Sequence, residues 1–131
     1  MATRCHFAQR GRAIAFQAMR VDHHKLVRDG IPGIIEAGGG RPVTRVLDQA
    51  GYRAALRAKL VEEAGEARTA PDRQLRAELA DVLEVLRALA AAHGMSWQDV
   101  MAEAARKRDE RGGFDQRMFL EYVESQSAQD M

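Results

Sequence analysis

The stretch KLVEEAGEARTAPDRQLRAELADVLEVLRALAAAHG, residues 59–94, decides the fold. On both sides of its Ala70-Pro71-Asp72 break, apolar residues recur at the three- and four-residue spacing of an amphipathic helix. This pattern predicts one long helix over about residues 48–69 and a second over about 72–93. The short break between them favours an antiparallel helical hairpin.

The segments on either side of this hairpin carry the signals of two further helices. Upstream, KLVRDGIPGIIEAGGG (25–40) predicts a short helix over residues 32–36, which begins at a proline and ends at a run of glycines. Downstream, a third long helix is predicted over about 96–111, where Ser96 is the N-cap and Asp99 its capping-box partner. Two segments are predicted to be loop or short extended chain, RPVTRVLD (41–48) and FDQRMFLEYV (114–123).

The composition points to one small helical domain with a thin core. The chain has 131 residues, of which 23 are alanine and 10 are leucine. Alanine favours helix but buries little area, and β-branched residues are too few for an extensive sheet. We expect an all-α domain over residues 21–123, an N-terminal extension over 1–20 and a disordered tail over 124–131. A core this thin is plausibly completed against copies of the same chain.

The charge balance excludes several classes of partner. Twenty basic and nineteen acidic residues leave a net charge of +1, so the chain has no global field for nucleic acid or for a membrane surface. A single cysteine, Cys5, rules out a disulfide framework. Residues 1–20 hold four arginines and no acidic residue, as some organelle-targeting peptides do, but we interpret them as a ragged extension of a cytoplasmic protein.

Several carboxylates break the rule that charges avoid the apolar stripe of an amphipathic helix. On a helical wheel of about 100° per residue, Glu63 falls inside the stripe of the first long helix and Glu66 lies at its edge. In the second helix, Glu78 lies at the margin of the stripe and Asp81 one step further out. Each pair has i, i+3 spacing and so shares a helix face. The break at Pro71 places the two pairs roughly level across the hairpin.

Four carboxylates that converge on one point need a cation, because an unpaired buried carboxylate is costly. All-oxygen ligation suits a hard cation, Mg²⁺ or Mn²⁺, and Glu62 adds a fifth carboxylate that could help to hold a second ion. The alternative is a set of surface glutamates in ordinary helical ion pairs, such as Lys59 with Glu63. A di-iron site is disfavoured, because neither carboxylate pair contains the histidine that such bundles use.

These motifs resemble those of the MazG-like, all-α nucleoside triphosphate pyrophosphohydrolases. VEEAGE (61–66) and ELAD (78–81) match the EExxE…ExxD signature of that superfamily. One branch, the predicted house-cleaning pyrophosphatases related to phosphoribosyl-ATP pyrophosphohydrolase, is similar over about residues 22–120. The similar segments are KLVRDGIP (25–32), RPVTRVLD (41–48), ADVLEVLRALAAAHG (80–94) and KRDERGGF (107–114).

The resemblance implies a fold around a four-helix bundle, usually in a homodimer or homotetramer with sites at subunit contacts. It implies Mg²⁺-dependent hydrolysis of a (d)NTP to (d)NMP and pyrophosphate. Carried onto this chain, the main metal ligands are Glu63, Glu66, Glu78 and Asp81. Glu62 matches the extra glutamate that assists a further metal or activates water. Either Glu62 or Glu63 is expected to be the base that activates the attacking water.

The triphosphate also needs basic side chains. In the third helix, Lys107 and Arg111 extend an apolar stripe rather than pointing away from it, which favours phosphate binding over ordinary placement at a helix C-terminus. Lys25 and Arg28 are the second pair of candidates. Two alternatives to a house-cleaning enzyme stay open: a phosphoribosyl-ATP pyrophosphohydrolase, and a non-catalytic helical partner protein.

Overall fold

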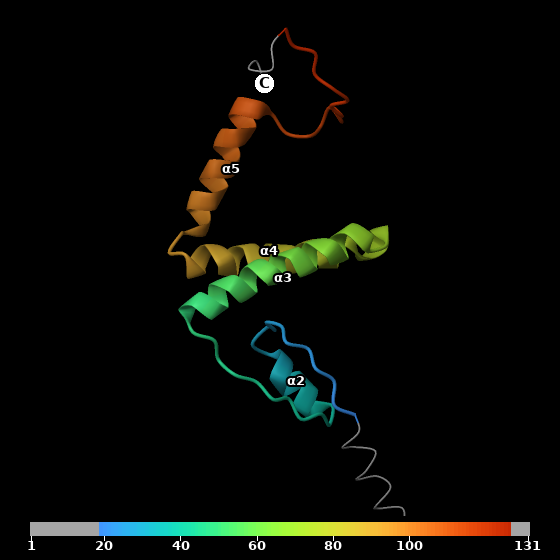
Figure 1. The fold of residues 1–131 in the computed structure, drawn as a ribbon, viewed down its shortest axis with the longest axis vertical. Coiled ribbons are helices and arrows are strands. Elements are labelled where there is room, and N and C mark those ends of the chain that lie inside the picture. Colours follow the sequence, from blue (N-terminus) through green and yellow to red (C-terminus); the bar gives the residue numbers. More distant parts are fainter. Residues whose placement is uncertain (1–18, 127–131) are drawn as a thin grey trace, which may run out of the picture. The chain divides into compact units, whose positions relative to one another are not determined.

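The computed structural model describes residues 19–126 of the chain. Within this range every regular element is a helix, so the predicted all-α class is confirmed (Figure 1). The elements are α2 (Ile31–Ala37), α3 (Gln49–Thr69), the short 3-10 helix η1 (Asp72–Gln74), α4 (Leu75–Ala92) and α5 (Trp97–Arg111). None of these helices has the length and apolar character that a membrane crossing requires. The predicted N-terminal extension lies almost entirely outside the described residues.

The chain divides into two compact units, and the division falls inside α3, between Glu62 and Glu63. In the first unit, α2 begins at Ile31, one residue before the predicted Pro32, which lies in its first turn. Gly38 is its C-cap, and Gly39 then adopts a positive φ of 93°. Asp48 caps α3, because its side chain accepts a hydrogen bond from the Gly51 backbone N–H at 2.7 Å.

The second unit begins with the last turns of α3 and continues through η1 into α4. The predicted helix over 72–93 is wrong in its first turn, which is a 3-10 turn. Pro71 is extended, with ψ at 148°, and the Gln74 N–H donates to the Pro71 carbonyl at 2.8 Å. This i, i+3 bond closes the tighter 3-10 turn before the α-helical pattern starts at Leu75.

The core of this unit is thin, as the composition predicted. Val85 and Ala90 are its buried apolar residues on α4. The apolar stripe that the sequence predicts on α4 is only partly covered within the described residues, since Leu79 remains 54% exposed and Leu83 41% exposed. Its members are Leu75, Leu79, Val82, Leu83, Leu86 and Leu89. The two buried residues of α4, Val85 and Ala90, are not members of this stripe.

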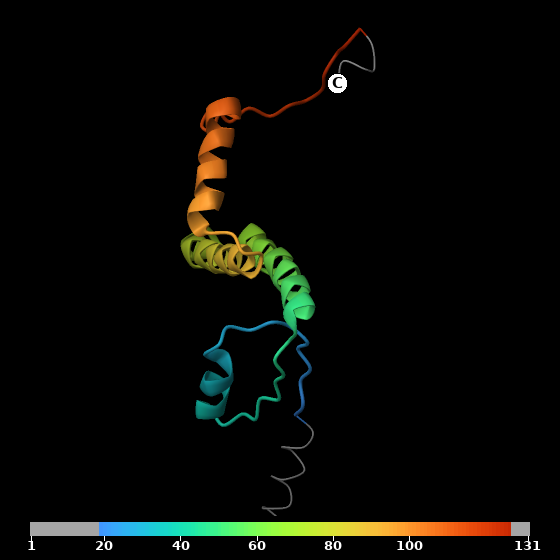
Figure 2. The same ribbon diagram turned by 90° about the vertical axis from the view of Figure 1, so that its left-hand side faces the viewer.

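The start of α5 follows its sequence signals closely. Gly94, with φ at 72°, ends the preceding helix, and Ser96 forms the predicted capping box with Asp99. The Arg87 guanidinium of α4 lies 5.0 Å from the centre of the Trp97 ring, so a cation–π contact joins α4 to the first residue of α5. Figure 2 shows α5 leaving the end of α4 rather than folding back along it.

Candidate metal centre on α3 and α4

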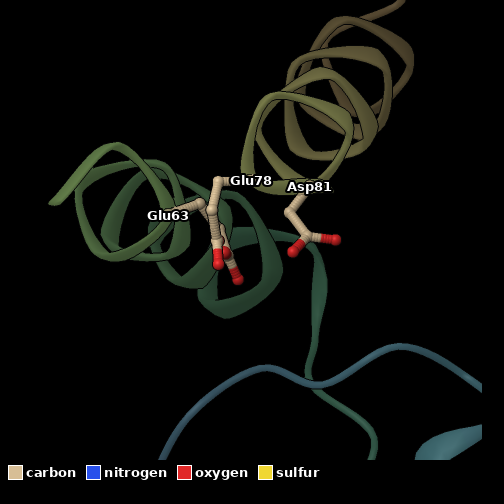
Figure 3. Close-up of side chains that lie close together, drawn as sticks. All are labelled: Glu63, Glu78 and Asp81. Atoms are coloured by element: carbon tan, nitrogen blue, oxygen red, sulfur yellow. The ribbon is translucent and has the colours of Figure 1, made fainter. Parts of the chain in front are cut away.

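Three carboxylates from two helices converge in the second unit. Glu63 projects from α3, and Glu78 and Asp81 project from α4 (Figure 3). One carboxylate oxygen from each residue lies within 4.8 Å of the other two. The i, i+3 spacing on α4 puts two of these groups on one face, and the break at Pro71 brings that face to the end of α3.

Glu63 is the buried member of this acidic cluster (Glu63, Glu78 and Asp81). Glu63 is 8% exposed, and among residues 19–126 no other charged residue is buried. Charged side chains are rarely buried unless they are paired or bind a metal. The helical wheel places Glu63 inside the apolar stripe of α3 and so predicts its burial, which the structure confirms.

The electrostatics of the cluster are concentrated on Glu78. Partial burial raises the pKa of Glu78 above its ordinary value, and the charges of Glu66, Asp81 and Glu63 raise it further. One of its oxygens, Oε2, is buried and has no hydrogen-bond partner in the described part of the chain. The site therefore concentrates negative charge and holds a carboxylate oxygen that lacks a donor.

Glu66, the fourth predicted ligand, lies next to the cluster rather than within it. Its residue is exposed, and a hydrogen bond between its side chain and Glu78 contributes to the raised pKa of Glu78. Glu66 is not among the three residues whose oxygens lie within 4.8 Å of one another. The structure thus brings three of the four predicted ligands together and places the fourth against Glu78.

Glu62 is held by lysines. Its Oε1 accepts hydrogen bonds from Lys25 Nζ at 3.3 Å and from Lys59 Nζ at 3.4 Å. Partial burial acts to raise the pKa of Glu62, but the hydrogen bond from Lys25 and the charges of the two lysines outweigh it, so the pKa lies below its ordinary value. The helical spacing that suggests Lys59 as a partner of Glu63 does not indicate the pair between Glu62 and Lys25, 37 residues away.

The predicted phosphate-binding residues are placed in three regions. Lys107 and Arg111 lie exposed on the second half of α5, and no basic side chain contributes to the pKa shift of Glu78 within the described residues. Arg28 lies in the turn before α2, where its carbonyl accepts from the Ile31 N–H at 3.0 Å. Lys25 contacts Glu62 as described above. Neither of the two α5 cations therefore contributes to the electrostatics of Glu78.

The donor set of the cluster fits a small hard cation. Oxygen ligands about 2.1 Å from a Mg²⁺ ion lie within about 4.2 Å of one another, so modest side-chain rotations would let all three residues share one ion. The buried Glu78 Oε2 is the kind of orphaned acceptor that such an ion satisfies. Histidine and cysteine are absent from the cluster, which disfavours zinc and other softer metals.

Comparison with known proteins gives one partial match. Over 54 residues the chain is 50% identical to an uncharacterized protein of Mycolicibacterium smegmatis. The match covers 41% of this chain and 55% of that protein, so the chain spans about half the length of the curated relative. No protein-family profile matches the chain, and no solved structure matches it.

Proposed function

We propose that the protein is a Mg²⁺-dependent nucleoside triphosphate pyrophosphohydrolase that cleaves (d)NTP to (d)NMP and pyrophosphate. The observation that carries the proposal is the convergence of Glu63, Glu78 and Asp81 within 4.8 Å, at the positions of the EExxE…ExxD signature. The substrate class and the house-cleaning role rest on the resemblance of the sequence motifs, and the proposed cytoplasmic location rests on the interpretation of residues 1–20. Mn²⁺ is expected to replace Mg²⁺, because both prefer oxygen ligands.

The acidic cluster, with Glu66 beside it, would hold the cation. When bound, the cation neutralises the phosphates and polarises the α-phosphoryl group. The reaction adds a water oxygen to the α-phosphorus and breaks the bond to the bridging oxygen, which leaves with pyrophosphate and keeps the electron pair. A carboxylate of this chain, Glu62 or Glu63, takes the proton that the water loses.

The ion pairs of Glu62 bear on its part in this reaction. Two ammonium groups lower its proton affinity, so Glu62 becomes an effective base only when Lys25 or Lys59 moves off it. A negatively charged ligand would compete with Glu62 for either ammonium group. A triphosphate that attracts either ammonium would therefore raise the proton affinity of Glu62.

The outer phosphates need cations that the cluster lacks. Lys107 and Arg111 on α5 are the proposed source, with Lys25 and Arg28 as the second pair. Because neither of the two α5 cations contributes to the electrostatics of Glu78 within the described residues, we propose a four-helix-bundle arrangement in a homodimer or homotetramer. In that assembly α5 of one copy supplies phosphate contacts to the next. The partly exposed stripe that includes Leu79 and Leu83 provides apolar surface for such an assembly.

The test is pyrophosphate release by the purified full chain. The substrates are canonical, oxidised and deaminated (d)NTPs and phosphoribosyl-ATP, each with Mg²⁺, with Mn²⁺ and with a chelator. We expect metal-dependent formation of the monophosphate and pyrophosphate, abolished by Glu63→Gln. The matched control is Glu84→Gln, an exposed glutamate on α4 that lies outside the cluster and should leave the rate unchanged.

The outcomes separate the competing functions. Turnover of phosphoribosyl-ATP alone would identify a phosphoribosyl-ATP pyrophosphohydrolase instead of an enzyme that acts on (d)NTPs. A folded chain that neither binds Mg²⁺ nor releases pyrophosphate would contradict the metal site and leave a non-catalytic helical partner protein. In that case Glu63→Gln should stabilise the fold, because it removes a buried charge.

A further inference from the structure

An apolar segment after α5 has no part in the proposed catalytic function. The C-terminal arm, residues 114–123, follows α5 and contains no helix or strand. Six of its ten residues are large and apolar, and they are between 56% and 97% exposed: Phe114, Met118, Phe119, Leu120, Tyr122 and Val123. Contiguous exposed apolar surface of this kind marks a site of interaction.

The arm is large enough to form a substantial part of an interface. Its three aromatic side chains are each at least 75% exposed. At about 150–250 Å² apiece they alone offer about 500 Å². A stable protein interface buries about 800 Å² on each partner. With the aliphatic residues added, one arm approaches that area.

A groove of matching character lies on α5 of the same unit. It has a volume of about 360 Å³ and is lined by Met95, Asp99, Val100, Glu103, Ala104 and Lys107. Its lining is mainly apolar and also includes the charged residues Asp99, Glu103 and Lys107, a mixture that protein interfaces show as well. A space of this size accepts an aromatic side chain with a neighbouring residue.

The charges of the two surfaces are complementary. The lining of the groove offers the Asp99 carboxylate, whereas the Glu103 carboxylate already accepts from Arg106, and the arm carries Arg117 directly before its apolar run. The lining also includes Lys107, and the arm carries Glu121. Carboxylates that already accept one bond, as Asp99 does from the Ser96 N–H, keep further acceptor sites for an arginine.

The direction of the arm favours a second copy over the same chain. The groove lies toward the start of α5, whereas the arm departs from its end after Gly112, whose φ is 81°. Figures 1 and 2 both show the arm leaving α5 sideways and not returning along it. When two α5 helices pair antiparallel about a two-fold axis, the end of each lies beside the start of the other. Each arm then meets the partner's groove without reversing its course.

We propose that two copies of this chain exchange their C-terminal arms, each of which docks its apolar side chains in the α5 groove of the other copy. This interface needs neither metal nor nucleotide to form, and it lies beside Lys107, which the proposed function uses for phosphate binding. It assigns a role to the segment after Gly113, for which the catalytic proposal has no use.

The test measures self-association of the full chain by sedimentation velocity over a concentration series, without metal or nucleotide. Phe119→Asp alters the arm, and Gln116→Asp adds the same charge to the arm without removing an apolar residue. Ala104→Arg fills the groove, and Ala105→Arg places the same side chain on another face of α5. We expect Phe119→Asp and Ala104→Arg each to raise the dissociation constant by at least about tenfold, and the two controls to leave it within about twofold.

Mixing the two disruptive variants distinguishes exchange between copies from docking within one chain. A Phe119→Asp copy keeps an intact groove and an Ala104→Arg copy keeps an intact arm, so their heterodimer retains one arm–groove contact. Exchange predicts that the mixture associates more strongly than either variant alone. Docking within one chain predicts no gain on mixing, and a partner of another kind predicts that none of the variants alters self-association. Either of these two results would overturn the proposal. Circular dichroism of the helices is the control that the α5 variants stay folded.

Discussion

Glu78 carries the strongest electrostatic conflict in the described chain. Its pKa is raised by partial burial and by three neighbouring carboxylates, Glu66, Asp81 and Glu63. An amide at this position keeps the shape of the side chain and removes its charge. We therefore expect Glu78→Gln to increase the stability of the metal-free protein and to weaken Mg²⁺ binding by at least about tenfold.

Chemical denaturation in a chelator and Mg²⁺ titration calorimetry measure the two effects. Glu84→Gln, on the exposed side of the same helix, serves as the control for the loss of a charge from α4. A Glu78→Gln variant that is less stable in the chelator would show that the carboxylate is satisfied within the folded chain. It would then contradict the interpretation of Glu78 as a metal ligand.

The same residue predicts a pH dependence. Because the pKa of Glu78 is higher in the folded protein than its ordinary value of 4.5, the folded state holds this proton more tightly than the unfolded state does. The unfavourable contribution of Glu78 is therefore present at neutral pH. It declines as the pH falls through the folded pKa and disappears below the ordinary value.

The measurement is the difference in unfolding free energy between Glu78→Gln and the unaltered chain, in a chelator, from pH 7 down to about pH 4. We expect the advantage of the variant to shrink as the pH falls toward the ordinary value of 4.5. Taking the difference between the two proteins cancels contributions to stability that both share. One of these is Glu62, whose lowered pKa means that its stabilising contribution is lost as the pH falls. A difference that stays constant with pH would contradict the raised pKa.

At the scale of elements, the helices could be predicted because their signals are local. Pro71 fixes the break, the Ser96–Asp99 capping box fixes the start of α5, and Gly94 ends α4. The convergence of Glu63, Glu78 and Asp81 could also be predicted, because it follows from i, i+3 spacing and one short connection.

Features that depend on packing could not be predicted in this way. The pair between Lys25 and Glu62 joins residues 37 positions apart, and nothing in either local pattern specifies it. The burial of Val85 in place of the predicted stripe depends on how α4 packs, which the wheel does not determine. The 3-10 turn of η1 depends on one hydrogen bond to the Pro71 carbonyl, which the apolar periodicity does not reveal.

Gly65 gives a prediction about α3 itself. It lies inside the helix, and a Cβ atom built on it would meet nothing within 4 Å. Glycine inside a helix destabilises by about 0.5–1 kcal/mol relative to alanine, so Gly65→Ala should raise the unfolding free energy by that amount. Gly94→Ala is the contrasting variant, because the φ of 72° there disfavours any side chain and should lower stability. Thermal and urea denaturation test both, and a destabilised Gly65→Ala would indicate that the face of α3 at this residue is covered in an assembly.

At the scale of the whole molecule, we expect Mg²⁺ to stabilise the fold. A ligand that binds only the folded state raises the unfolding free energy of the whole domain, and a domain with a thin core gains the most from it. The acidic cluster needs α3 and α4 in place, and the unfolded chain has no comparable site. Stability should therefore rise with Mg²⁺ by about 1.4 kcal/mol for each tenfold increase in free ion above the dissociation constant. Glu63→Gln should remove this dependence, whereas K⁺ at equal ionic strength should not reproduce it. Thermal denaturation across a Mg²⁺ series measures the effect, and equal slopes for the unaltered chain and Glu63→Gln would place the ion elsewhere than at the acidic cluster.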